Sequence, residues 1–443
     1  MDFYSNFNYN FQFKTGVLSL KELVLKAFNL GQEEVKSTFL FCVLCYVWAF
    51  AITLGMRYSD SLFILQIGSE YLPATYRYES IGMILLSSFL LFSYSRYPVI
   101  YIFRGVIVAA LLFYSFVSFC FITETGTQTR ALWFALNVFG TQLFTVGITA
   151  IWTLIDYYYE NHRAKRLFGM FSSMIFMGAI TTGLIMRSGL LNRTVFTMLM
   201  AALVLFTGVW VSFISSKMGC SSRDKSNRYA FSLTKLIGGI ADSKFAKLVI
   251  AANLLTFLLW VITEYNYLHA FEMRFQRMAN EQQSPLPQFM GLCLSVVGVF
   301  NLIFGLFFYS RIIERYGIWN VLLYTPSLFL VMFFGWYLYD LFLFPLIGVF
   351  IVEGTLYVID DSNFSLLIKK LPPTYKNQVR VLIETFFEPI GMLISGIILG
   401  LPYLNSKFLG LIFAVLLFVV AFALKSTVKR ETERTEPELS TRA

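Results

Sequence analysis

Two long apolar runs without charges, separated by a short basic segment, constrain the fold of this chain most strongly. The runs Ala131–Ile155 and Leu167–Met186 flank Arg163, Lys165 and Arg166. A helix needs about 20 apolar residues to cross a bilayer, and each run is long enough. A basic loop between two such helices marks the cytoplasmic side. The pattern therefore predicts a membrane hairpin whose turn is this cytoplasmic basic loop.

The composition extends this prediction to the whole chain. Of the 443 residues, 57% are hydrophobic and only 14% are charged, whereas a soluble protein carries about 25% charged residues. We therefore expect an all-α integral membrane protein with the lipid bilayer as its surroundings. The net charge of +9 is assigned to loops on one side of the membrane and not to nucleic-acid binding.

The apolar runs predict about twelve transmembrane helices in two sets of six. The predicted spans are 37–56, 80–95, 105–123, 131–155, 167–186 and 194–216, then 248–263, 288–310, 316–339, 341–359, 385–406 and 408–424. We expect a cytoplasmic amphipathic lead-in (1–36), an N-terminal six-helix bundle (37–216), a cytoplasmic linker (217–247), a C-terminal six-helix bundle (248–424) and a disordered charged tail (425–443).

The orientation follows from the basic residues. With these spans, roughly three quarters of the 35 Lys and Arg residues fall on the side that holds the lead-in, the linker and the tail. The positive-inside rule then places both termini in the cytoplasm.

The two sets of spans resemble each other weakly. Span 4 ends at Asp156 and span 10 at Asp360, and a basic loop follows each. The next spans carry the spaced glycine pairs Gly178/Gly183 and Gly391/Gly396, and glycines allow close helix approach. Two pseudo-equivalent six-helix bundles are typical of alternating-access transporters. The loop SRIIERYG, residues 310–317, also resembles a loop motif of the major facilitator superfamily.

Polar residues inside the predicted spans are the candidate substrate-binding residues, because a charge in hydrocarbon needs a partner or a water-filled cavity. Glu353 lies in the middle of span 10, Glu264 lies near the outer end of span 7, and Arg57 and Asp60 close span 1. The complete candidate set is Arg57, Ser59, Asp60, Asn137, Gln142, Glu264 and Glu353.

Catalytic chemistry is not expected. The sequence contains no Walker A loop, no G-x-S-x-G, no HExxH and no cluster with metal-ligand spacing. We therefore predict a protein that is not an enzyme, with no cofactor and no metal, and one that binds and releases a small molecule.

Four stretches resemble the nucleotide (ATP/ADP) translocases of plastids and obligate intracellular bacteria, within the major facilitator-like superfamily. DSLFILQIGSEYLP (60–73) is similar to their K-D-x-L…G-x-E-x-x-P pattern, and WTLIDYYYENHRAKRLF (152–168) to FW-x-x-AN…EAKRFY. Glu264, in ITEYNYL, falls where the family has its L-x-E-x-x-W-K motif. The stretch YGIWNVLLYTP (316–326) resembles the family's GW…TP stretch. The resemblance implies an ATP/ADP antiporter in a bacterial inner membrane.

The chain departs from that family at three charged positions. Ser59 replaces the lysine before the first Asp, Asn137 replaces a glutamate, and Leu268 replaces the lysine of the W-K pair. A phosphate chain needs Lys or Arg at close range, and Arg57 is near enough to take that role. These departures predict weak or absent ATP/ADP exchange.

Three functions remain open from the sequence. The first is a monomeric secondary transporter for a nucleotide or related anionic metabolite. The second is a proton-coupled permease for a neutral or zwitterionic metabolite, with Glu353 or Glu264 as the proton carrier. The third is a non-transporting membrane receptor or assembly factor. A central site rich in Arg and Lys favours the first, and one lined by carboxylates and aromatic residues favours the second.

Overall fold

The computed structural model describes residues 34–94, 96–159, 161–218, 240, 243–276, 285–369, 379–380 and 382–440. Most of the predicted lead-in (1–36) and linker (217–247) therefore lies outside the described residues. The described residues are mostly helical, and many of the helices are long and apolar, which confirms the all-α membrane fold expected from the sequence.

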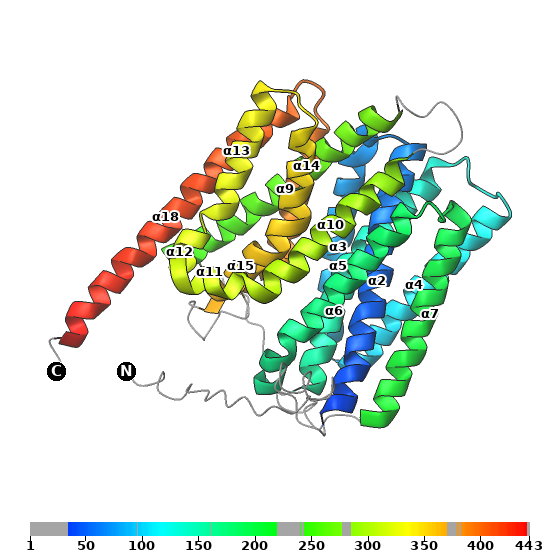
Figure 1. Cartoon of the computed structure of the whole chain (residues 1–443), viewed down its shortest axis with the longest axis horizontal. Helices are drawn as coiled ribbons and strands as arrows, with labels where there is room; N and C mark the ends of the chain where they lie inside the picture. Colours follow the sequence, from blue (N-terminus) through cyan, green and yellow to red (C-terminus); the bar gives the residue numbers. More distant parts are fainter. Residues whose placement is uncertain are drawn as a thin grey trace, which may run out of the picture.

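The helices form two groups, as Figure 1 shows. The first group comprises α2 (Val35–Gln66), α3 (Leu72–Tyr94), α4 (Val99–Ile122), α5 (Arg130–Tyr158), α6 (Asn161–Arg187) and α7 (Arg193–Met218), with η1 (Ser69–Tyr71) between α2 and α3. The second comprises α9 (Lys244–Gln276), α10 (Leu286–Phe307), α11 (Tyr309–Tyr316), α12 (Ile318–Val321), α13 (Tyr324–Leu338), α14 (Leu343–Val349), η3 (Phe350–Asp360), α15 (Asp361–Lys369), η4 (Ile383–Phe387), α17 (Glu388–Leu399) and α18 (Ser406–Ser440). Helix α2 begins and α18 ends on the same side of the molecule (Figure 1).

Within the described residues, 10 helices are long and apolar enough to span a membrane. The remaining two predicted spans correspond to α3 and to η4 with α17, which are not among these 10 helices. Helix α3 includes Arg77 and Glu79, and the second segment includes Glu384 and Glu388.

The contacts between helices repeat from one group to the other. In the first group, the first helix (α2) packs on the fourth, fifth and sixth (α5, α6 and α7). In the second group, α9 packs on α14, α17 and α18, which hold the same positions. The groups meet through α3 with α17 and α10 with α6, and each pair joins the second helix of one group to the fifth of the other. This arrangement makes the two six-helix bundles pseudo-equivalent.

Small residues allow the two bundles to approach closely. A Cβ atom on Gly291 of α10 would lie 2.6 Å from the carbonyl oxygen of Gly183 on α6, and a Cβ on Gly396 of α17 would lie 2.9 Å from that of Pro73. Both distances are too short for any side chain, so glycine is required at these crossings. Two of the four spaced glycines noted in the sequence therefore pack between the bundles.

The outer surface suits a lipid environment. Large apolar side chains point outward along several helices, and their exposed fractions include 66% for Leu85, 66% for Leu112, 61% for Phe116 and 68% for Val331. In water such a surface would cause aggregation, whereas hydrocarbon accommodates it.

The last helix is longer than the predicted span. Helix α18 continues to Ser440, whereas the predicted span ends at residue 424. Lys, Arg and Glu are good helix formers, and extending a helix that already exists requires no new nucleation. The backbone of the tail therefore continues the last span.

Candidate functional site

Arg57 of α2 is buried and joins the two bundles. Its Nη1 donates to Asp60 of α2 at 3.1 Å and to Glu264 of α9 at 2.8 Å, and its Nη2 donates to Glu353 of η3. The side chains of Arg57 and Glu353 are 6% and 9% exposed. One guanidinium from the first bundle thus binds two carboxylates of the second, and we call these four residues the Arg57 network.

Neighbouring polar groups hold the network in place. Asn137 of α5 donates from Nδ2 to Asp60 at 2.9 Å, and the Tyr267 hydroxyl lies 3.4 Å from both Glu264 and Glu353. Asn301 of α10 donates to the backbone carbonyl of Glu353 at 2.8 Å. Residues of α2, α5, α9, α10 and η3 therefore converge on one point between the bundles.

Local backbone features bring these helices together. Gly140 of α5 lies so close to Gly55 of α2 that an added Cβ would be 2.6 Å from the Gly55 carbonyl oxygen, which allows Asn137 to reach Asp60. Glu353 lies in η3, which is a π-helix. Widened turns of this kind are frequent at functional sites.

The buried charged side chains of the network and of the neighbouring Glu79 are predominantly acidic. Arg57 is the one buried basic side chain among the described residues, whereas Asp60, Glu79, Glu264 and Glu353 are all buried acids. Uncompensated buried charge costs several kcal/mol per ion, so one guanidinium cannot balance four carboxylates. Protons or a cationic ligand must supply the remaining positive charge.

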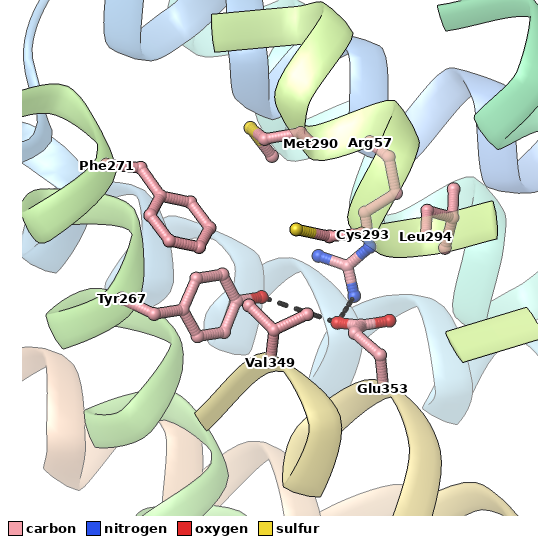
Figure 2. A pocket seen from close by; sticks show the side chains of 8 residues that line it. All are labelled: Arg57, Tyr267, Phe271, Met290, Cys293, Leu294, Val349 and Glu353. Atoms are coloured by element: carbon pink, nitrogen blue, oxygen red, sulfur yellow. Dashed lines mark hydrogen bonds and ion pairs between the residues drawn. The ribbon is translucent and has the colours of Figure 1, made fainter. Parts of the chain in front are cut away.

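A small pocket adjoins Arg57 and Glu353 (Figure 2). The space open to the centre of a water molecule is about 20 Å³, which is enough for about one water molecule. Figure 2 shows an aromatic and apolar wall contributed by the second bundle. The wall residues are Tyr267, Phe271, Met290, Cys293, Leu294 and Val349.

Further contacts close the bundles on each other. The Ser69 backbone N–H of η1 donates to Glu272 of α9 at 2.9 Å. The rings of Phe144 on α5 and Tyr357 on η3 lie 6.4 Å apart. Both contacts cross between the bundles and hold them together beside the network.

Five of the predicted site residues meet at this point: Arg57, Asp60, Asn137, Glu264 and Glu353. Ser59 is buried nearby, and its hydroxyl has no hydrogen-bond partner in the described structure. Gln142 packs instead against Gly82 of α3. The basic loop residues Arg163, Lys165 and Arg166 begin α6, and their side chains lie outside the described part of the chain.

Glu79 was missed by the sequence reasoning. It is 2% exposed, and the Thr141 hydroxyl donates to it at 3.3 Å. The predicted second span began at residue 80, so Glu79 was counted as a loop residue. Helix α3 begins at Leu72, which places this carboxyl inside the helix. The apolar run alone could not reveal a span that begins with the charged residues Arg77 and Glu79.

Comparison with known proteins establishes the fold and leaves the family open. No protein-family model matches the sequence, and no curated protein matches it, so the resemblance to the ATP/ADP translocases gains no support. Among solved structures, a point mutant of the nucleoside transporter NupG shares 14% identity and a TM-score of 0.64, covering 88% of this chain and 99% of that one.

Two further solved structures show the same relationship. A D-xylose–proton symporter shares 13% identity and a TM-score of 0.60, over 87% of this chain and 96% of that one. A bacterial homologue of the iron transporter ferroportin, in an inward-facing state, shares 12% identity and a TM-score of 0.58, over 90% and 100%. The chain is therefore a multi-pass membrane protein that shares the fold of these transporters.

Proposed function

We propose that the chain is a secondary transporter that works by alternating access and couples the movement of a small neutral or zwitterionic metabolite to protons. The observation that carries the proposal is that Arg57 is bonded to three carboxylates, two of them from the other bundle. The fold, shared with several transporters, supports the transport mechanism.

The same observation argues against a nucleotide as the substrate. A triphosphate carries several negative charges and requires Lys or Arg donors at close range. Arg57 is the one buried base in the described residues, and its guanidinium is already occupied. The surrounding acids would repel a phosphate chain, whereas an uncharged solute such as a nucleoside meets no such repulsion.

The Arg57 network supplies a mechanism for coupling. In the closed conformation, Arg57 links the bundles through Glu264 and Glu353. Protonation of either carboxylate removes a charge from that link and weakens it. The bundles can then rock apart and expose the pocket to one side of the membrane. Loss of the proton restores the link and closes the site again.

Uptake into proteoliposomes tests the proposal. The panel contains radiolabelled uridine, alanine, glucose and ATP, each measured with and without an imposed pH gradient. We expect saturable uptake of an uncharged or zwitterionic solute that the gradient accelerates, and no saturable uptake of ATP. The Glu353→Gln variant should lose the response to the gradient. Robust ATP uptake that is independent of the pH gradient would overturn the proposal in favour of nucleotide exchange.

A further inference from the structure

Glu79 is a buried acid that does not belong to the Arg57 network. It lies on α3 of the first bundle, and no Lys, Arg or His within the described residues forms an ion pair with it. Its described hydrogen bond is the one from Thr141, at 3.3 Å. A carboxylate this deeply buried requires either a proton or a bound cation.

Polar atoms without a partner occur on residues that neighbour Glu79 along α3 and Thr141 along α5, and on Ser59 of α2. The Asn137 Oδ1, the Tyr76 hydroxyl and the Ser59 hydroxyl are buried and have no hydrogen-bond partner in the described structure. Asn137 lies one helical turn before Thr141, whose hydroxyl reaches Glu79, and Tyr76 precedes Glu79 by three residues on α3. Because a buried polar atom left unpaired costs about 1–3 kcal/mol, this group of atoms indicates a site for a ligand.

The hydrogen-bonding character of the unpartnered atoms indicates which chemical group of a ligand would bind them. The Asn137 amide nitrogen faces Asp60 and donates to it, which leaves Oδ1 as the free end of the side chain. An amide oxygen accepts hydrogen bonds and does not donate them. Glu79 also accepts when it is ionised. The missing partner is therefore a donor, and a group with several N–H bonds satisfies more of these atoms than a single hydroxyl does.

The charge balance selects among donors. Asp60, Glu264 and Arg57 are the charged groups that act on Glu79 from the neighbouring helices, and Tyr76 is the titratable group beside it on α3. With Glu79 ionised, these groups would carry three negative charges and one positive charge. Either a proton on Glu79 or a bound cation such as an ammonium group removes that excess, whereas a hydroxyl supplies no charge.

We propose that Glu79, Asn137 and Tyr76 form a subsite in the first bundle that binds the primary ammonium group of the transported solute. The inference deepens the proposed function by naming the solute class, and it rests on that function. The solute is a zwitterionic amine whose ammonium group donates to Glu79 and to Asn137 Oδ1, and a simple primary amine serves as a probe of that group.

Binding at this subsite exchanges a cation for a proton. In the empty site the Glu79 carboxyl holds a proton. When the protonated amine enters, the O–H bond of the carboxyl breaks, the proton passes to water, and the carboxylate pairs with the ammonium group. The charge of the buried site is the same before and after, so neither state contains an additional uncompensated charge.

Calorimetry on the purified full-length protein tests the subsite without requiring transport. Tyramine is titrated at pH 7.5 in two buffers with different ionisation enthalpies, which gives the affinity and the number of protons released. Tyrosol, in which a hydroxyl replaces the ammonium group, is the matched ligand. The variants are Glu79→Gln, which keeps the shape of the side chain, and Tyr76→Phe, and the control is Glu124→Gln in an exposed loop.

We expect tyramine to bind the parent protein and the Glu124→Gln control with release of about one proton, and tyrosol to bind at least tenfold more weakly. Glu79→Gln should weaken tyramine binding at least tenfold and abolish the proton release, and Tyr76→Phe should weaken it less. Absence of tyramine binding, equal binding of tyrosol, or unchanged binding by Glu79→Gln would each overturn the subsite. If proton-coupled uridine or glucose uptake persists in that case, the proposed function stands and only the amine assignment fails.

Discussion

Removing the central cation should damage the protein far more than removing one of its acidic partners. Arg57 is held by Asp60, Glu264 and Glu353, and all four side chains are less than a tenth exposed. Arg57→Met keeps most of the side-chain length but leaves three buried carboxylates without a cation. Breaking a buried ion pair from one side costs about 3–5 kcal/mol, and we expect a loss of stability in that range.

Glu353→Gln is expected to have a much smaller effect. The glutamine carbonyl can still accept from Arg57 Nη2, and two carboxylates remain bonded to the guanidinium. The change also removes one charge from a site with too many acids. A charge-assisted hydrogen bond contributes about 1.5–3 kcal/mol, and replacing it with a neutral one should cost less than about 1.5 kcal/mol.

Thermal unfolding of the three proteins in detergent at pH 7.5 and pH 5 provides the measurement. At pH 7.5 the order of stability should be parent, Glu353→Gln and then Arg57→Met. At pH 5 the Arg57→Met deficit should shrink, because the uncompensated carboxylates can take up protons. Equal destabilisation by the two variants, or an Arg57→Met deficit that does not change with pH, would refute the charge argument.

Three further outcomes are expected. Gly291→Ala should reduce both thermal stability and uptake, because the added Cβ would lie 2.6 Å from a carbonyl oxygen of α6. The control is Gly169→Ala, whose added Cβ has no atom within 4 Å, and it should behave like the parent in the same unfolding and uptake assays. The hydrogen bond from the Lys407 ammonium lowers the pKa of Asp340, so Asp340→Asn should reduce the free energy of unfolding by less than about 1 kcal/mol at pH 7. This deficit should shrink as the pH falls below 3.8, the usual pKa of an aspartate. A deficit that grows in acid would contradict the argument. Asn137→Glu places a second carboxylate where an amide now donates to Asp60 at 2.9 Å, and we expect lower thermal stability, restored at pH 5.

The fold was predictable from the sequence because lipid imposes strong rules on composition. Uncharged runs such as Ala131–Ile155 identify spans by length alone, and α5 (Arg130–Tyr158) contains that run. Boundaries were less predictable where charge enters a helix. The sequence pattern predicts that Arg57 and Asp60 close the first span, whereas α2 continues to Gln66 and buries both.

The candidate site was predictable in part, for the same physical reason. A charge inside an apolar run stands out, so Glu353 and Glu264 were found, but the sequence does not show which charges meet. Arg57 and Glu353 are almost 300 positions apart and are joined by packing between the bundles. From the sequence, Arg57 is a candidate to bind a phosphate group, whereas in the structure its guanidinium is paired with carboxylates. Glu79 was missed because Arg77 and Glu79 interrupt the apolar run at the start of α3.

Proton movement that accompanies solute movement tests the central claim most directly. Proteoliposomes containing a pH-sensitive dye receive uridine, alanine or tyramine in turn, without any imposed gradient. We predict that a transported solute changes the internal pH in proportion to its uptake, and that Glu353→Gln abolishes this change while the protein remains folded. Uptake of a solute at the full rate with no change in internal pH would contradict proton coupling at the Arg57 network.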